Sequence, residues 1–286
     1  MSSKADIKII AESLNDSVPS THELYETGNF GGIRELAQEQ DAKGGTYIDV
    51  NVGGRSAAFF SAVIKAVQSA TRKPLSIDTP DITLAEAALR DYDDSAGKPI
   101  LNSISPLRTD MFALYKIKAF RPILLISERS DGGNAGACRS DTETFEAANF
   151  LLAEAGKYGI ANEDLIFDPG IAPIGTDSEG NLVRLISALR MMREDSSFAG
   201  VHASVGLSNF TVMLPAKRRD GSLVKGPLES AFLTRAMLLG LDYVIGSVRR
   251  NYEILSDDHP AMQCVDDCLK LTGFDAIQRV RQFYKG

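Results

Sequence analysis

The sequence predicts an α/β fold, a (β/α)₈ TIM barrel whose single domain spans residues 1–286. Short apolar runs alternate with amphipathic segments from end to end, without a linker or low-complexity stretch, as expected for parallel strands joined by crossover helices. At 286 residues and 44% apolar composition, the chain can form one such core unaided. Five runs lead to a hydrogen-bonding side chain: Asn51, Asp78, Asn102, Asp168 and Asn209. In such a barrel these positions lie at the carboxyl ends of strands, where catalysis takes place.

Eight runs have the length and composition of strands. In chain order they are Ile7–Ala11, Tyr47–Val52, Leu75–Ile77, Pro99–Asn102, Ile123–Ile126, Leu165–Phe167, Val201–Val205 and Tyr243–Gly246. Helical periodicity marks two of the intervening segments, with apolar faces formed by Phe145, Ala148, Leu152 and Ala155 and by Leu182, Leu185, Ile186, Leu189 and Met192.

Helix boundaries are also visible in the sequence. Ser140 and Glu143 form a capping box at the start of the first of these two helices, and Gly156 and Gly159 end it. The segment from Met262 to Tyr284 reads as two helices broken at Gly273.

A doubly wound dinucleotide-binding fold is disfavoured. The first strand runs into Glu12-Ser13-Leu14-Asn15, which lacks the glycine fingerprint that such a fold needs, and the chain has no Walker A sequence. The glycine-rich stretch Asp131–Gly136 could form an anion-binding nest or a plain flexible loop, and the sequence leaves both open.

Composition excludes several classes of function. The net charge of −7 argues against a general role on nucleic acids or anionic membranes. The N-terminus does not resemble a signal peptide, and no apolar run approaches the roughly 20 residues of a membrane helix, so we expect a cytoplasmic protein. Cys138, Cys264 and Cys268 are few and widely spaced, which predicts reduced thiols.

The strand-end side chains predict a ligand class. Asp78, Asn102 and Asp168 offer mostly acceptors, with one amide that also donates. This set suits a flat ring whose edge carries N–H donors beside a carbonyl, such as a pterin, and each charge-assisted bond would contribute roughly 1.5 to 3 kcal/mol. A metal site or simple strand-end caps are the alternatives, although no phosphate-binding partner for Mg²⁺ is evident nearby.

Five segments together carry a family resemblance: Ile48-Asp49-Val50-Asn51-Val52-Gly53, Ile77-Asp78-Thr79, Leu101-Asn102-Ser103, Phe167-Asp168-Pro169 and Gly206-Leu207-Ser208-Asn209. In order and spacing they resemble the pterin-binding methyltransferases, above all the methyltetrahydrofolate:corrinoid-protein methyltransferases and the folate module of cobalamin-dependent methionine synthase. Glu12-Ser13-Leu14-Asn15 also resembles the first strand end of these proteins.

This resemblance implies a one-carbon methyltransferase that moves a methyl group between tetrahydrofolate and the cobalt of a corrinoid protein, in a direction left open. It implies that Asp78, Asn102 and Asp168 bind the pterin ring, that Gly206 lies in the substrate site, and that Asn209 is the catalytic residue beside the methyl-bearing nitrogen. It also implies a homodimer and cobalamin carried by the corrinoid partner. Because the expected ring ligands are carboxylates and an amide, we expect no metal in the site.

The chemistry explains an amide at position 209. A methylated tertiary amine is a poor methyl donor unless the nitrogen is protonated, so the site must favour the charge that appears there. An amide can donate or accept as that charge changes. The sequence shows no obvious general acid, so we expect the proton to come from water. Of His22, His202 and His259, only His202 lies near a strand end, where it is structural or catalytic.

Three other features of the sequence each allow two interpretations. Cys264 and Cys268 with His259 suggest either zinc ligands or helix-core cysteines. The loop Phe210–Gly226, longer than in the proteins it resembles, carries Lys217, Arg218 and Arg219. These side chains are either solvated or in contact with the folate tail or an acidic partner surface. Arg249 and Arg250 form either an anion site or a surface pair.

Two alternative functions stay open on the sequence. A dihydropteroate synthase-like enzyme must bind a pyrophosphate leaving group with a Ser-Arg-Lys-type motif at the seventh strand, where this chain reads Gly206-Leu207-Ser208-Asn209. A noncatalytic pterin-binding protein would retain the pocket alone, and the presence of Asn209 argues against it. Fold analogy does not decide between them.

Overall fold

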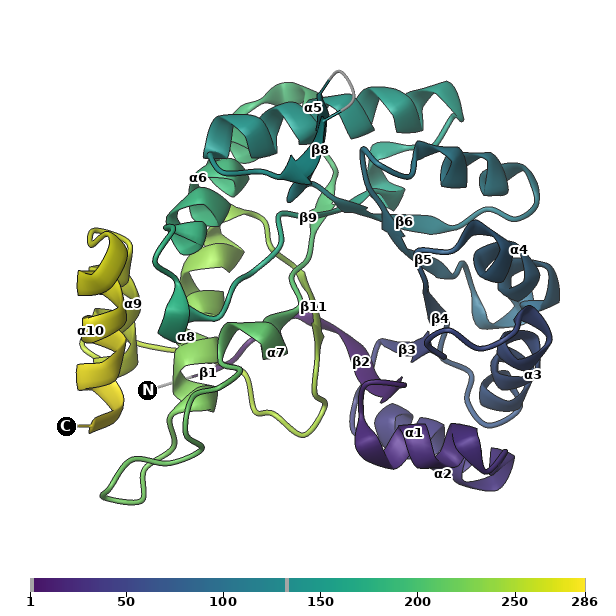
Figure 1. Cartoon of the computed structure of the whole chain (residues 1–286), viewed down its shortest axis with the longest axis horizontal. Helices are drawn as coiled ribbons and strands as arrows, with labels where there is room; N and C mark the ends of the chain where they lie inside the picture. Colours follow the sequence, from purple (N-terminus) through teal and green to yellow (C-terminus); the bar gives the residue numbers. More distant parts are fainter. Residues whose placement is uncertain (1–2, 132–133, 286) are drawn as a thin grey trace.

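In the computed structural model, which describes residues 3–131 and 134–285, eight parallel strands surround a common axis (Figure 1). Each of the eight predicted runs overlaps one strand, so the barrel prediction is confirmed. The hydrogen-bonded order is β10, β9, β6, β5, β4, β3, β2 and β11, and parallel bridges from Ala203 to Leu241 and from Gly206 to Ile245 complete the ring. The strands are β2 (Lys8–Asn15), β3 (Tyr47–Asn51), β4 (Leu75–Asp78), β5 (Ile100–Ile104), β6 (Arg121–Leu125), β9 (Ile166–Asp168), β10 (His202–Ala203) and β11 (Tyr243–Gly246).

Most helices cover the outside of the barrel, α7 lies at the carboxyl ends of the strands, and the last two helices pack beyond α8 (Figure 1). The helices are α1 (Pro19–Glu26), α2 (Phe30–Ala42), α3 (Ala57–Gln68), α4 (Ile82–Asp91), α5 (Asp141–Lys157), α6 (Asn181–Glu194), α7 (Leu207–Phe210), α8 (Lys225–Ala236), α9 (Pro260–Cys268) and α10 (Gly273–Lys285). Within the described ranges, none of them has the length and apolar character that crossing a membrane requires.

The predicted boundaries of α5 and of the last two helices are confirmed. The Ser140 hydroxyl accepts a hydrogen bond from the Glu143 amide at 3.1 Å, and the Glu143 carboxylate accepts one from the Arg139 amide. α5 ends at Lys157, followed by Gly159 at a φ of 70°. Gly273 separates α9 from α10 with a φ of 56°, a left-handed conformation that glycine adopts without strain.

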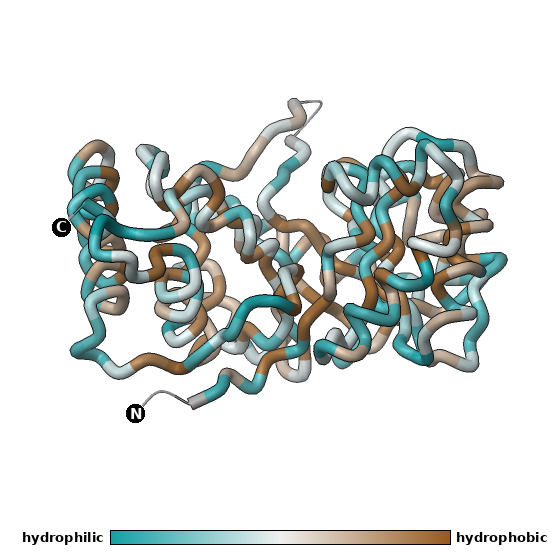
Figure 2. Tube along the Cα trace, turned by 90° about the horizontal axis from the view of Figure 1, so that it is seen from below, coloured by the Kyte–Doolittle hydropathy of each residue, from teal (hydrophilic) through white to brown (hydrophobic). Residues whose placement is uncertain are grey.

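A layer of side chains fills the interior of the barrel. Its members come from six strands: Ile10, Tyr47, Ile100, Ile123, Ile166 and Tyr243. Most stand at or near the amino-terminal start of their strands, and all are at most 7% exposed. Apolar stretches accordingly run through the middle of the molecule while polar turns lie outside (Figure 2). Because this layer fills the barrel interior, side chains at the carboxyl ends of the strands have free space only on the carboxyl-terminal side of the layer.

Three segments differ from the sequence interpretation. β2 continues past Ala11 to Asn15, with a register shift between Ala11 and Leu14. The seventh run forms a strand only at His202–Ala203, so Asn209 lies on the helical turn α7 rather than at a strand end.

The third difference concerns the residues around the glycine-rich stretch, which were expected to form a nest or a plain loop. Asp131 and Asn134–Gly136 belong to an antiparallel pair, β7 (Glu128–Asp131) and β8 (Asn134–Ala137), and residues 132–133 lie outside the described residues. A further short antiparallel pair joins β1 (Ser3–Lys4) to β12 (Glu253–Ile254).

Candidate functional site

A cavity of about 440 Å³ opens at the carboxyl ends of the strands. Four of the five residues that the sequence predicts for the site line it: Asp78, Asn102, Gly206 and Asn209. The remaining lining residues are Glu12, Ser13, Asn15, Ser17, Val18, Asp49, Ser208, Ile245 and Ser247. The fifth predicted residue, Asp168, does not line this cavity. The barrel thus gathers residues from β2, β3, β4, β5 and α7 around one polar space.

Glu12 is a cavity acid that the sequence interpretation did not assign a role. It lies at the register shift of β2, and a bulge of this kind redirects side chains, often beside active sites. Its carboxylate accepts a hydrogen bond from the Ser208 hydroxyl at 2.9 Å. Burial raises the pKa of Glu12, and the negative charge of Glu229 adds to this, while Ser208 and Arg250 oppose it. Glu12 can therefore carry a proton at a higher pH than an ordinary glutamate.

Asp49 is a second acid that the sequence interpretation missed. It occupies the middle of β3 and is 1% exposed, yet it lines the cavity. Neither of its carboxylate oxygens has a hydrogen-bond partner of good geometry in the described part of the chain, although Ser76 and Asn102 lie close enough to lower its pKa. Burial, followed by the negative charge of Asp78, raises the pKa of Asp49 well above its ordinary value. A buried acid without partners is suited to binding a ligand donor.

Asp78 is oriented by its neighbour on the adjacent strand. The Asn51 side-chain amide donates to the Asp78 carboxylate at 3.0 Å, while the Asn51 carbonyl accepts from the Gly53 amide at 2.8 Å. Burial raises the pKa of Asp78, and the hydrogen bond from Asn51 opposes the shift. Two neighbouring carboxyls in a buried site resist ionising together, so Asp49 and Asp78 favour a shared proton.

Asn209 is placed at the cavity by the turn that begins at Gly206. The Asn209 amide N–H donates to the Gly206 carbonyl at 3.0 Å. A Cβ atom at position 206 would lie 2.9 Å from Nδ2 of Asn209. Glycine at this position therefore leaves the space that the Asn209 side chain occupies.

Asp168 lies at the end of β9 and is 5% exposed. Its carboxylate accepts hydrogen bonds from the Gly170 amide at 2.8 Å and from the Ser204 hydroxyl at 3.1 Å. Burial raises the pKa of Asp168 to about 6, although these two hydrogen bonds and the nearby charge of Arg184 oppose the rise. A carboxylate has about four acceptor positions, so two remain for a ligand.

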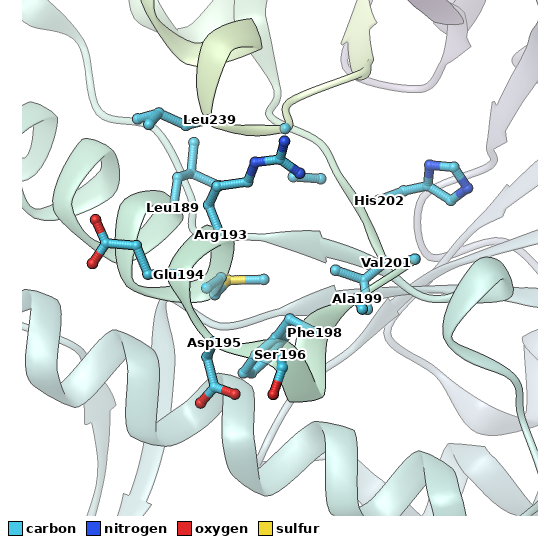
Figure 3. Close-up of a pocket in the computed structure, with 14 residues that line it drawn as sticks. Leu189, Arg193, Glu194, Asp195, Ser196, Phe198, Ala199, Val201, His202 and Leu239 are labelled. Atoms are coloured by element: carbon cyan, nitrogen blue, oxygen red, sulfur yellow. The ribbon is translucent and has the colours of Figure 1, made fainter.

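The candidates outside this cavity have structural contacts. His202 lies at the amino-terminal start of β10, and its Nδ1 is 2.6 Å from the Asp242 carboxylate. It borders a cavity of about 250 Å³ at the opposite end of the barrel, where its ring lies apart from Leu189, Arg193 and Leu239 (Figure 3). His202 does lie at one end of a strand, but it is the amino-terminal end of β10. It therefore lies away from the acids described above, which are at the carboxyl ends.

The cysteines and the histidine near the C-terminus are accounted for by packing. Cys264 and Cys268 are buried on α9, and Nδ1 of His259 accepts the Ala261 amide at the start of that helix. Among the described residues there is no group of three side chains suited to a metal ion.

The two arginines after β11 do not form one site. Arg249 is paired at the surface with Glu39 at 2.8 Å, whereas Arg250 lies 3.3 Å from the buried carboxylate of Glu229. In the long loop, Lys217 and Leu223 form an antiparallel bridge, and the Arg218 guanidinium stacks on Phe283 at 3.8 Å. Lys217 and Arg219 are exposed, so the three basic residues differ in role.

Comparisons with known proteins agree with this geometry. A family model described as pterin binding enzyme matches residues 25–246. The methylcorrinoid:tetrahydrofolate methyltransferase of Eubacterium limosum is 26% identical over 245 residues, which cover 83% of each chain. Two solved structures show the same fold. Dihydropteroate synthase from Yersinia pestis, with a pterine-sulfa conjugate, has a TM-score of 0.57 and 17% identity over 93% of this chain and 95% of its own. The dihydropteroate synthase of Thermus thermophilus, in complex with 6HMPPP, has a TM-score of 0.56 and 22% identity over 85% and 88%.

Proposed function

The chain belongs to the pterin-binding enzyme family, and from this premise we propose that it moves a methyl group between tetrahydrofolate and the cobalt of a corrinoid protein. The observation that carries the proposal is one cavity that contains acceptors for a pterin ring, the Asn209 amide and the protonatable acid Glu12. The relative from Eubacterium limosum, whose name states this chemistry, supports it.

The cavity fits a pterin ring through its acceptors. A pterin presents an amino group and a ring N–H side by side, and a carboxylate can accept both. Asp78 and Asn102 line the cavity, and the carboxyl of Asp49, on the strand next to that of Asp78, adds acceptor positions to the same space. In our proposal Asp168 binds the ring edge from β9, two strands away from β5 in the barrel, with its two free acceptor positions.

The transfer step needs a proton at the ring nitrogen. In the direction of cobalt, the N–CH₃ bond breaks and its electron pair stays on nitrogen, which binds a proton. Cobalt(I) supplies the electron pair of the new bond and becomes methyl–cobalt(III). Asn209 follows the charge on the nitrogen, and we choose Glu12 as the proton donor because it lines the same cavity and is bonded to Ser208, the residue next to Asn209. Water, the source expected from the sequence, is the alternative.

The first test is methyl transfer itself. Free cob(I)alamin and methyltetrahydrofolate are incubated with the protein, and the reverse reaction starts from methylcobalamin and tetrahydrofolate. We expect the cobalamin spectrum to change from cobalt(I) to methyl–cobalt(III) in the first case and the opposite in the second. Folate binding without transfer in either direction would rule out the proposed reaction and leave the two alternatives, a dihydropteroate synthase-like enzyme and a noncatalytic pterin-binding protein. Absence of binding would contradict the proposal altogether.

The loop between α7 and α8 is the surface that we propose for the corrinoid protein. Most of this loop is exposed, namely residues 212–213, 215–217 and 219–223, and Met213 is 81% exposed. The loop projects beyond the barrel (Figure 1). Its exposed positive charges are Lys217 and Arg219, because Arg218 is engaged with Phe283, and Asp220 is an exposed negative charge that accepts hydrogen bonds from Ser222. The homodimer implied by the resemblance stays a prediction that sedimentation would check.

We expect the double substitution of Lys217 and Arg219 to Ala to slow transfer to the corrinoid protein roughly 3- to 10-fold. Removing charges at the rim of an interface lowers the association rate, whereas free cobalamin has no protein surface to attract. Stopped-flow rates with both acceptors measure the difference. Arg190 and Arg193 on α6 are exposed and offer the matched control of two removed positive charges. Equal slowing with both acceptors would show that the loop does not bind the partner.

A further inference from the structure

A buried carboxylate lies behind the Asn209 turn, outside the cavity lining. Glu229 on α8 is 1% exposed, and it accepts a hydrogen bond from the Thr211 hydroxyl at 2.5 Å. On the other side of the same turn, the Ser208 hydroxyl donates to Glu12 at 2.9 Å. Asn209 therefore stands between two hydroxyls, each of which is bonded to a different carboxylate.

Arg250 supplies the counter-charge to Glu229. Its Nε lies 3.3 Å from Oε2 of Glu229, and its side chain is 38% exposed, whereas that of Glu229 is 2% exposed. A buried carboxylate is costly without a partner, so the pair has a reason to form. It is also asymmetric, because the negative end is in the protein interior and the positive end reaches solvent. The negative end dominates the electrostatics inside.

We propose, on the basis of the function proposed above, that Glu229 and Arg250 are positioning residues that orient Asn209 through Thr211 and set the charge beside Glu12. The groups that face Glu12 from the elements around it are Ser208, Glu229, Arg250 and, more distantly, Asp49 and the Tyr252 hydroxyl. Of these, Glu229 favours a protonated Glu12 and Arg250 favours an ionised one. Burial has the largest effect on the Glu12 pKa, and the two charges of the pair adjust the pH range over which this acid retains its proton.

The decisive variants change the two charges separately. Glu229→Gln keeps an acceptor for Thr211 but removes the negative charge, so the Glu12 pKa should fall by about half a unit to one unit. Arg250→Gln removes the positive charge, so the same pKa should rise. The double variant should return toward the wild-type value. Arg249→Gln is the matched control, because Arg249 is engaged with Glu39 at the surface, and we expect no shift from it.

Two readouts separate this inference from the proposed function. Titration of the Glu12 carboxyl by NMR, on the whole protein without substrate, reports its pKa whether or not the protein transfers methyl groups. The alkaline limb of single-turnover methyl transfer should move in the same directions. If Glu12 titrates at one pH in wild type and both single variants, the charge pair has no such effect and the inference is overturned. If the titration shifts but wild type transfers no methyl group, the proposed function fails instead.

The positioning part has its own variant. Thr211→Val removes the hydroxyl that reaches Glu229 while leaving both charges in place, and Thr211→Ser restores it. We expect Thr211→Val to lower the single-turnover rate about 3- to 10-fold at pH values below the alkaline limb, where Glu12 retains its proton, and Thr211→Ser to recover most of the rate. A Thr211→Val protein with the wild-type rate would contradict the positioning role of Glu229.

Discussion

Replacing Asn209 with Ala is expected to lower the single-turnover rate of methyl transfer about 10²- to 10³-fold, the range found when one preorganised donor is removed. In our proposal the ring nitrogen changes from a neutral tertiary amine to a protonated or electron-rich centre during the step. Asn209 stands at the cavity on a turn of four residues, with its amide against Gly206. It is therefore held where the charge changes.

The accompanying loss of folate affinity should be much smaller, because a neutral tertiary amine gains little from one amide contact. The expected signature is thus a large fall in rate with a modest change in Kd, measured by single-turnover kinetics beside equilibrium titration. Asn15→Ala is a matched control. Asn15 lines the same cavity, but its carbonyl accepts hydrogen bonds from the Ser17 amide and hydroxyl at 2.9 and 2.7 Å. An Asn209→Ala protein that loses affinity as far as it loses rate would show uniform binding rather than catalysis.

The barrel was predictable from the sequence because its signals are local. Each strand is a short apolar run, and each helix carries a face of period 3.6, so alternation along the chain determines the architecture. The end of a strand is also a local signal, since the apolar run stops at a polar residue. Asp78, Asn102 and Asp168 were identified as strand-end residues for this reason, and the structure places them at the ends of, or within, β4, β5 and β9.

Two acids of the cavity, Glu12 and Asp49, were missed because their positions depend on register and on neighbours far away in the chain. Asp49 stands in the middle of an otherwise apolar strand. An acid at such a position was the signal in the sequence that could have indicated a cavity residue. Glu12 points to the cavity because β2 continues through a register shift that no periodicity reveals. Its pairing with Ser208, 196 positions away, arises only when the first and seventh segments of the ring meet.

Asn209 and Arg250 illustrate the same limit. The run from Val201 to Asn209 was expected to place Asn209 at the end of a strand. The chain instead turns at Gly206 into α7. Arg250 and Arg249 are adjacent in sequence, yet one reaches a buried acid and the other a surface acid. Sequence reasoning can identify charged residues near a site, but the direction of a long side chain is decided by the partners that the fold brings close.

Replacing Asp168 with Ala is expected to weaken tetrahydrofolate binding by about 30- to 1,000-fold, which corresponds to roughly 2 to 4 kcal/mol for the loss of a buried pair of charge-assisted hydrogen bonds. The carboxylate must be ionised to accept two ring donors. Since burial raises the pKa of Asp168 to about 6, binding to wild type should be strongest above pH 6 and should weaken up to tenfold for each unit below it.

Asp168→Asn separates this charge from the shape of the side chain. The amide oxygen can still accept from Gly170, which the wild-type carboxylate does at 2.8 Å, so the turn after β9 should persist. The variant removes a buried charge, and we expect it to unfold at a temperature no lower than wild type. Its folate affinity should be reduced at neutral pH, and the ratio of its Kd to that of wild type should shrink toward one between pH 7 and pH 5, because wild type loses its ionised carboxylate there. Isothermal calorimetry at the two pH values measures this ratio. Glu12, Asp49 and Asp78 titrate in both proteins, so their effects on the two Kd values cancel from the ratio to first order. A ratio that stays constant with pH, or an affinity of Asp168→Ala equal to wild type, would show that Asp168 supports the fold of β9 and does not bind the ring.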